Sequence, residues 1–342
     1  MEKTPMHAHH RRAGSRGLNL TIVLLHGLLL VAGLLASAAA AADDGTFPVT
    51  VKHALGSTTI EAPPKRIVTL GWNAEDIVLA LGEVPIAMPR YSFFESGIFP
   101  WNEERLSGAL PVLLPGRTAD FEQVAALKPD LILATSSDID DLAWNRLSTI
   151  APTVAYRSGP FAADWKEQTQ IVGMALGRPG AADRLIEGTE EFVEKIASRY
   201  PQLRGKTFTF GTYFPGSGGI VVYLPSDPRV AALAGMGLRV SSGVKTLAAD
   251  KPDEQSVSVS LEEISSIDAD VLIMWYGPGA RAAAEQQPLF KTLGAVRRGS
   301  YVALEDPVDV WSTSALSVLS IPYGFPRFVP RLAEAASRAD GE

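Results

Sequence analysis

The sequence predicts an α/β protein of two Rossmann-like lobes with central, mainly parallel sheets, joined by a long interdomain helix, with a ligand cleft between the lobes. Three observations predict this fold. Short apolar strands alternate with helices on both sides of residues 159–204, that stretch is itself helical, and a 14-residue pattern occurs twice. Apolar strands alternating with helices are typical of parallel sheets covered on both faces.

The N-terminus has the composition of a secretory signal. A basic head is followed by the apolar run Leu18–Leu35 and by small residues that end at Ala42. This order predicts a signal peptide, residues 1–42, cleaved near Ala42, and an exported, periplasmic protein. Two alternatives stay open: the run is long enough to be retained as a membrane anchor, and Arg11-Arg12 could mark twin-arginine rather than Sec export.

Composition excludes several classes of protein. The chain has no cysteine, so it is not a lipoprotein and has no disulfides. Without residues 1–42 it keeps 27 basic and 37 acidic residues, a formal charge of −10, which argues against nucleic acid and anionic membranes. Only one histidine, His53, follows the leader. A bare transition-metal site usually needs several imidazoles or thiolates, so we expect no metal site.

The predicted first lobe spans residues 43–158. An extended lead-in ends near residue 65, and residues 90–110 are predicted to be a long loop. Strands are predicted at 66–70, 85–88, 112–114, 131–135 and 153–156, with helices at 74–81, 120–127 and 139–149. Residues 159–204 then form the predicted helical connector, which Pro201 and Gly205 end.

The predicted second lobe spans residues 205–342 and resumes the α/β alternation. Strands are predicted at 207–210, 220–224, 271–276 and 301–304, with helices at 229–234, 261–265 and 312–337. Ile321-Pro322 is predicted to interrupt the last helix.

The repeated pattern aligns Phe121–Ala134 with Leu261–Met274 at a constant offset of 140 residues. Glu122 matches Glu262 and Asp130 matches Asp270. Each copy predicts a short helix with an acid in its first turn, where the helix dipole favours it, followed by a buried strand. Two similar lobes that face each other form a cleft, and clefts between lobes bind ligands.

At these positions the chain resembles the periplasmic binding proteins of iron–siderophore ABC importers, a group that also contains cobalamin and haem binders. The resemblance covers about residues 60–337. It rests on Arg66–Leu70, Glu75–Gly82, Phe121–Ala134, Ile150–Val154, Trp165–Arg178 and Ser260–Ile264, with Pro100-Trp101 and Leu319–Gly324 most like the ferric-siderophore branch.

The resemblance implies a binding protein that delivers a ferric siderophore to the permease subunits of an ABC importer. It also implies that Glu122 and Glu262 contact arginines on the permease. Haem or cobalamin remains an alternative ligand, and the siderophore class (catecholate, hydroxamate or mixed) stays open. The missing cysteine departs from the lipid-anchored members of the family. We expect a monomer without a cofactor.

Ligand contacts are expected just after the strands, since ligands of open α/β sheets lie beyond the carboxyl ends of the strands. Arginine and aromatic side chains suit an oxygen-rich, aromatic chelate whose iron already has its six oxygens. Arg117 is the first candidate, because hydroxamate binders of the resembled family carry a contacting arginine in a similar place. The other candidates are Trp72, Arg90, Tyr91, Trp101, Tyr213, Trp275, Tyr276 and Trp311.

A secreted enzyme is the alternative from another class. Acid pairs such as Glu103-Glu104 could suggest a glycosidase, but no acid, base and nucleophile occur in matched loops. Gly216–Gly219 lacks the lysine of a phosphate loop. We therefore expect no catalytic residues.

Overall fold

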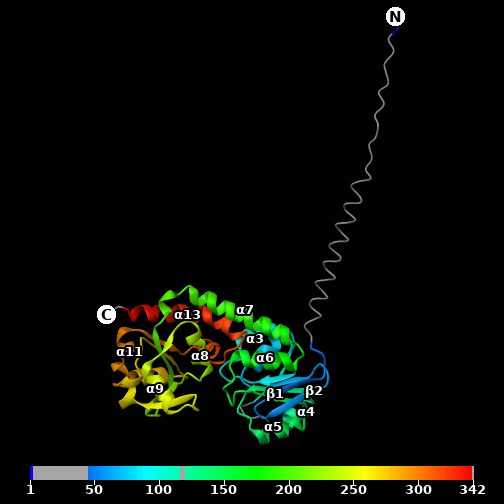
Figure 1. The fold of residues 1–342 in the computed structure, drawn as a ribbon, viewed down its shortest axis with the longest axis horizontal. Helices are drawn as coiled ribbons and strands as arrows, with labels where there is room; N and C mark the ends of the chain where they lie inside the picture. Colours follow the sequence, from blue (N-terminus) through cyan, green and yellow to red (C-terminus); the bar gives the residue numbers. More distant parts are fainter. Residues whose placement is uncertain (3–44, 116–119, 341–342) are drawn as a thin grey trace. The chain divides into compact units, whose positions relative to one another are not determined.

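The computed structural model describes residues 1–2, 45–115 and 120–340. Gly45–Glu342 form one compact unit with two larger β-sheets, a two-stranded hairpin, flanking helices and the long helix α7 (Pro179–Ser198), which confirms the predicted α/β class (Figure 1). The predicted signal, its cleavage near Ala42 and its alternative as an anchor lie outside the described residues. Within the described ranges, no helix is both long and apolar enough to cross a membrane.

The first sheet is entirely parallel, with the strand order β5-β4-β3-β6-β7. Its strands are β3 (Ile67–Gly71), β4 (Ala87–Pro89), β5 (Val112–Leu114), β6 (Leu131–Ser136) and β7 (Thr153–Ala155). Its helices are α2 (Ala74–Ala80), α3 (Pro100–Leu106), α4 (Phe121–Ala126) and α5 (Asp141–Ser148). All of β6 is buried, as expected for a central strand with helices on both faces.

The predicted lead-in is an antiparallel hairpin of β1 (Val49–His53) and β2 (Gly56–Ile60). The Thr58 hydroxyl donates a 2.6 Å hydrogen bond to the carbonyl of Thr153, which ties the hairpin to β7. His53 is buried here, with Nε2 3.0 Å from Thr58 Oγ1. The one histidine outside the leader is therefore part of the packing of this hairpin.

The connector consists of α6 (Trp165–Ala175), α7 and the 3₁₀ turn η1 (Pro201–Leu203). Asp164 caps α6, because its carboxylate accepts a 2.7 Å hydrogen bond from the Glu167 amide. Pro179 begins α7, where its missing N–H costs nothing. Helix α13 (Ser320–Arg338) lies beside α7 (Figure 1).

The second sheet is mixed, with the order β11-β9-β8-β12-β13 and β10 paired to β8. Its strands are β8 (Thr207–Tyr213), β9 (Gly219–Tyr223), β10 (Arg239–Val240), β11 (Ser256–Ser260), β12 (Val271–Trp275) and β13 (Tyr301–Leu304). Its shorter helices are α8 (Pro228–Gly235), α9 (Ser242–Asp250), η2 (Leu261–Ile267), α10 (Ala280–Gln286), η3 (Phe290–Thr292) and α11 (Gly294–Arg298). Strands β9 and β11 are antiparallel to their neighbours, whereas β8, β10, β12 and β13 run parallel.

The chain ends with α12 (Pro307–Ser314) and α13, joined by residues 315–319. The predicted break at Ile321-Pro322 is wrong. Pro322 lies in the first turn of α13, where proline is tolerated, and residues 315–319 form the break instead. This segment reaches the first sheet's helices, because Asn73 Nδ2 donates a 2.7 Å hydrogen bond to the Leu316 carbonyl.

The two copies of the repeat occupy equivalent places in the two sheets. Asp130 accepts hydrogen bonds of 2.8 and 2.7 Å from the amides of Lys65 and Arg66, just before β3. Asp270 accepts a 2.7 Å hydrogen bond from the amide of Thr207, which begins β8. In both copies, the strand that follows the aspartate pairs in parallel with the strand whose start donates hydrogen bonds to that aspartate. The copies differ in their helices, since α4 is an α-helix and η2 is 3₁₀.

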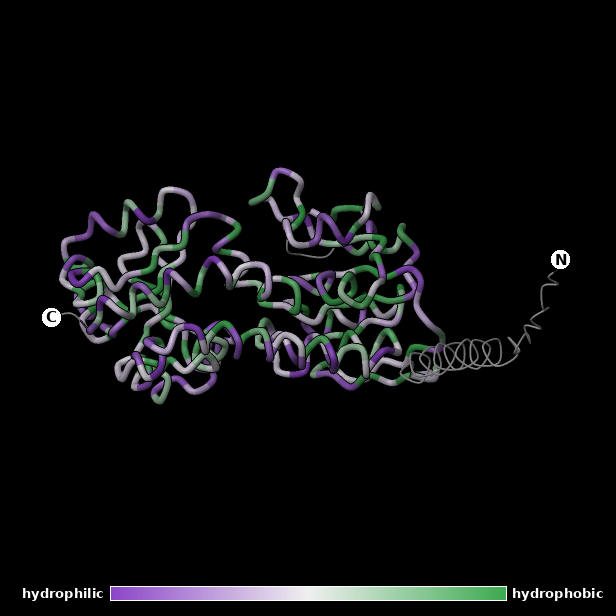
Figure 2. Tube along the Cα trace, turned by 90° about the horizontal axis from the view of Figure 1, so that it is seen from above, coloured by the Kyte–Doolittle hydropathy of each residue, from purple (hydrophilic) through white to green (hydrophobic). Residues whose placement is uncertain are grey.

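The hydrophobic core continues from one sheet to the other. One cluster of buried side chains contains Leu133 of β6, Ile273 of β12 and Leu332 of α13. Figure 2 shows green, hydrophobic stretches running through both halves of this unit. The lobe boundaries near residues 158 and 204 remain predictions, and "first lobe" and "second lobe" below mean the parts that carry the first and second sheet.

Candidate functional site

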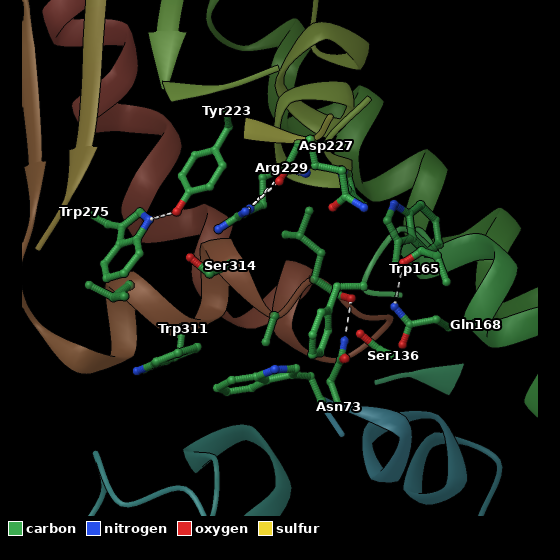
Figure 3. A pocket seen from close by; sticks show the side chains of 18 of the residues that line it. Asn73, Ser136, Trp165, Gln168, Tyr223, Asp227, Arg229, Trp275, Trp311 and Ser314 are labelled. Atoms are coloured by element: carbon green, nitrogen blue, oxygen red, sulfur yellow. Dashed lines mark hydrogen bonds and ion pairs between the residues drawn. The ribbon is translucent and has the colours of Figure 1, made fainter. Parts of the chain in front are cut away.

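A cavity of about 390 Å³ lies between the two lobes. It is enclosed by residues at strand ends, on α6 and α8, and on α12 with the segment that follows (Figure 3). Its lining consists of Trp72, Asn73, Ser136, Phe161, Ala163, Trp165, Gln168, Tyr223, Asp227, Pro228, Arg229, Gln255, Ser256, Trp275, Val310, Trp311, Ser314, Ala315 and Leu316. This is the position that the strand-end rule predicts for a ligand.

The turn after β3 brings Trp72 and Asn73 to the cavity. Gly71 has φ +84°, and a Cβ there would lie 2.2 Å from the carbonyl oxygen of Ser136. Only glycine fits this close approach of two strands. The Trp72 amide then donates a 2.8 Å hydrogen bond to the same carbonyl, which fixes where the turn leaves the sheet.

Aromatic rings from both lobes form much of the wall. Trp72 stacks on Trp311 with ring centroids 4.7 Å apart and planes 14° apart. Phe93 stacks on Trp311 at 4.4 Å and is 49% exposed, so it extends this aromatic surface outward. Across the cavity, Trp275 Nε1 donates a 3.0 Å hydrogen bond to the Tyr223 hydroxyl (Figure 3). Such a wall suits a ligand with flat or apolar parts.

Arg229 is the cation among the described residues of the cavity lining, and neighbouring side chains hold it in place. Asp227 accepts hydrogen bonds from Nε at 2.8 Å and Nη2 at 2.6 Å, and the guanidinium lies 3.6 Å from the centre of the Tyr223 ring (Figure 3). Burial alone would lower the pKa of Arg229, but its hydrogen bonds with Asp227 and that carboxylate's charge raise it overall. Arg229 is therefore a permanent, oriented donor.

Several buried polar atoms of the lining have no hydrogen-bond partner among the described residues. They are Asn73 Oδ1, Gln168 Oε1 and Ser314 Oγ. The amide nitrogens of the first two are engaged, by the carbonyls of Leu316 and Ala163. Buried polar atoms without partners are costly, so these three are candidate ligand contacts.

The structure brings three of the predicted contacts together and places five elsewhere. Trp72, Trp275 and Trp311 line the cavity. Arg90 is exposed and does not line it. Tyr213 and Tyr276 are buried in a separate core of the second lobe, and Tyr276 has its hydroxyl 2.6 Å from that of Tyr301. Arg117 lies outside the described residues.

Tyr91 and Trp101 surround a pair of buried acids, Glu75 and Asp76. The Tyr91 hydroxyl donates a 2.6 Å hydrogen bond to Glu75 Oε1, and Trp101 Nε1 donates a 2.7 Å hydrogen bond to Asp76 Oδ2. Trp101 is on α3, where the sequence predicts only a loop, because Pro100 begins a helix there. Both aromatic side chains thus support α2 and are absent from the cavity lining.

Both buried acids have raised pKa values. Burial, with the adjacent charge of Asp76, raises the pKa of Glu75 to about 8. Burial raises the pKa of Asp76 to about 6, although hydrogen bonds from Ser317, Asn102 and Trp101 oppose the rise. Neither carboxyl lines the cavity and both are fully buried. Shifted acids often mark catalytic sites, but these two are enclosed within the packed helices.

Sequence reasoning missed Arg229, Tyr223 and Trp165. Tyr223 ends β9, and Arg229 follows it through Asp227-Pro228. Because β9 runs antiparallel to β8, the rule for the carboxyl ends of parallel strands does not cover these residues. Trp165 begins α6, where its helical spacing indicated only packing.

The two repeat glutamates lie apart from the cavity. Glu122 and Glu262 are both exposed in the first turns of α4 and η2, and neither is in the lining. No group of three or more His, Cys, Asp or Glu side chains that could hold a metal occurs in the described ranges.

Comparison with known proteins shows consistent similarity. Over 271 residues the chain is 27% identical to the Fe(3+) dicitrate-binding periplasmic protein FecB of Escherichia coli, covering 78% of this chain and 84% of FecB. The structure resembles Streptococcus pneumoniae PiaA in complex with ferrichrome, with a TM-score of 0.77, 28% identity, and coverage of 85% of this chain and 100% of PiaA.

A periplasmic solute-binding protein from Mycobacterium smegmatis is also similar. It has a TM-score of 0.74 and 33% identity, and the match covers 84% of this chain and 98% of that protein. Residues 67–307 match the model of the periplasmic binding protein family. The chain therefore belongs to the periplasmic binding protein family, whose members bind solutes and are not enzymes.

Proposed function

We propose that this protein works outside the cytoplasm. There it captures a ferric siderophore in the cavity between its lobes and delivers it to an ABC-type importer. The observation that carries the proposal is the aromatic cavity with one oriented arginine. Iron inside a siderophore already has its oxygen ligands, so the protein needs a shaped pocket rather than metal ligands. The Fe(3+) dicitrate in the name of FecB and the ferrichrome in the complex with PiaA support this class of ligand.

Haem is less well supported than a siderophore. Haem iron usually takes an axial ligand from His, Tyr, Met or Cys. His53 lies in the β1–β2 hairpin and does not line the cavity. Tyr223 does line it, but its hydroxyl accepts from Trp275 and its ring lies under Arg229. A haem iron would have to displace these contacts.

Delivery rests on Glu122 and Glu262. Both are exposed, and each lies in the first turn of the helix that precedes a central strand. Their equivalent positions in the two lobes suit a permease that contacts both lobes at once. Docking would then leave the cavity, where the ligand sits, free of permease side chains.

Tryptophan fluorescence tests the proposal directly, because four of the six tryptophans line the cavity. The protein is titrated with ferric hydroxamate and catecholate siderophores, haem and cobalamin. We expect saturable quenching by at least one ferric siderophore and recovery of that ligand unchanged. Quenching by haem or cobalamin alone, or chemical conversion of the siderophore, would contradict the proposal.

A further inference from the structure

The charges of the described side chains on the cavity wall cancel. Among the described residues of the lining, Asp227 and Arg229 are the charged ones. They form an ion pair through two hydrogen bonds, from Nε at 2.8 Å and Nη2 at 2.6 Å. The part of the wall that the structure describes therefore presents an oriented donor group with no net positive charge.

Asp227 is a fixed part of this arrangement. It is 1% exposed, and its carboxylate caps α8 by accepting a 2.9 Å hydrogen bond from the Arg229 amide. The side chain of Arg229 is 21% exposed, so the arginine, and not the aspartate, is the partner left accessible to a ligand. An anionic ligand that reaches Arg229 also approaches a buried negative charge.

Apart from the unpartnered Ser314 hydroxyl, which can donate a hydrogen bond, the described residues of the rest of the wall give an anion little compensation. Trp72, Trp275 and Trp311 contribute aromatic surface. The unpartnered amide oxygens of Asn73 and Gln168 are acceptors, which attract N–H donors and repel negative oxygens. Moving uncompensated charge from water into such surroundings is costly.

From this balance we propose that the site selects ferric chelates without net charge over anionic ones, and that Asp227 determines the preference by neutralising Arg229. The inference rests on the proposed function. Three singly charged hydroxamates balance the three positive charges of Fe(III), and the chelate is neutral. Three doubly charged catecholates leave three negative charges. The favoured substrate class is thus the trihydroxamate.

The wild-type protein tests the first half of the proposal. Affinities for ferrichrome, a neutral trihydroxamate, and ferric enterobactin, a trianionic tris-catecholate, are measured by tryptophan quenching at several salt concentrations. We expect ferrichrome to bind at least about 10-fold more tightly. We expect its affinity to change by less than about two-fold between roughly 0.05 and 0.5 M NaCl. Tighter binding of the trianion, or a steep loss of ferrichrome affinity with salt, overturns the proposal.

Asp227→Asn tests the second half. Asparagine is also a good helix cap, so the variant removes the charge and keeps the cap of α8. We expect the ratio of the two affinities to shift toward ferric enterobactin by at least about 10-fold. Asp140→Asn, which changes the equivalent cap of α5 outside the cavity, should leave the ratio unchanged.

The outcomes separate the two proposals. An unchanged ratio in a folded Asp227→Asn protein overturns the role of Asp227. If that variant fails to fold, the wild-type affinities for the two chelates, and their dependence on salt, still show whether the site selects ligands by charge. If no ferric chelate of either charge binds, the proposed function itself fails.

Discussion

The hydroxyl of Ser317 donates a 2.5 Å hydrogen bond to Oδ2 of Asp76, a residue 241 positions earlier in the chain. Asp76 also accepts hydrogen bonds from Trp101 Nε1 at 2.7 Å and Asn102 Nδ2 at 2.6 Å. The same hydroxyl accepts from the amides of Leu319 and Ser320, which begin α13. One buried carboxylate thus connects α2 and α3 of the first lobe to the start of the C-terminal helix.

Ser317→Ala should destabilise the protein, because it leaves buried donors and acceptors without partners. We expect a loss of about 1–3 kcal/mol in the free energy of unfolding, the usual cost of unsatisfied buried groups. Chemical denaturation measures the change. The exposed Ser148→Ala on α5 is the control and should change stability by less than about 0.5 kcal/mol. Equal stabilities for the two variants would show that the hydrogen bond is energetically unimportant.

Glu75→Gln should reduce the loss of stability that we expect as the pH rises. The folded protein keeps the Glu75 proton up to about pH 8, because burial and the charge of Asp76 raise this pKa, whereas the unfolded chain loses it near pH 4.5. The folded state binds more protons than the unfolded state across that window, so the free energy of unfolding falls as the pH rises. Glutamine stays neutral, so the contribution of residue 75 to this fall in the free energy of unfolding disappears.

Melting temperatures between pH 5 and 8 measure the effect. The wild-type melting temperature should fall more steeply over this range than that of Glu75→Gln. Glu187→Gln, on the exposed side of α7, is the matched control and should follow the wild-type profile. Parallel profiles for all three proteins would mean that Glu75 is ionised in the folded state.

Local sequence pattern predicted the central strands and several helix starts. Leu131–Ala134 is apolar throughout because β6 is covered on both faces. Asp120 accepts from the amides of Glu122 and Gln123 and begins α4 as predicted. In contrast, Pro100 begins α3 inside a segment whose glycines and aromatics indicated a loop. A single proline at N1 is a weak pattern, and packing on Asp76 through Trp101 supports the helix instead.

The cavity depends on contacts that no local pattern records. The strand-end rule places Trp275 and Tyr276 together, but alternation sends Tyr276 to the core and Trp275 to the cavity. Tyr91 has the same strand-end position and is buried against Glu75, because α2 packs over it. Arg229 faces the cavity because Asp227 caps α8 and holds the guanidinium. These orientations follow from packing between segments far apart in the chain.

Arg229→Gln should weaken ferric siderophore binding and also destabilise the protein. The substitution removes the charged donor of the cavity and leaves Asp227, which is 1% exposed, as an unpaired buried charge. Breaking a buried ion pair from one side typically costs about 3–5 kcal/mol. Denaturation and fluorescence titration measure the two effects separately.

The double variant Asp227→Asn/Arg229→Gln separates stability from binding. It removes both charges, so we expect most of the lost stability to return while the affinity stays at least about 10-fold below wild type. Arg281→Gln, at an exposed ion pair with Glu285 and Glu305 outside the cavity, should change neither property strongly. Full affinity in the double variant would remove Arg229 from the binding site.

Reversing the charges of Glu122 and Glu262 should abolish transport without affecting capture. Both side chains are exposed and outside the cavity lining, so Glu122→Lys/Glu262→Lys should fold and bind the ferric siderophore with wild-type affinity. Lysines would repel the permease arginines that the proposal places opposite them. Uptake of radioactive iron by cells that carry the matching importer measures the loss.

A second reversed pair tests whether the effect depends on position. Glu187→Lys/Glu191→Lys makes the same change in net charge on the exposed side of α7 and should leave uptake near wild type. Each single variant, at Glu122 or at Glu262, should retain partial uptake if the permease contacts both lobes. Wild-type uptake by the Glu122→Lys/Glu262→Lys protein would rule out the docking role. Equal losses of uptake in both double variants would show that the loss depends on net charge alone.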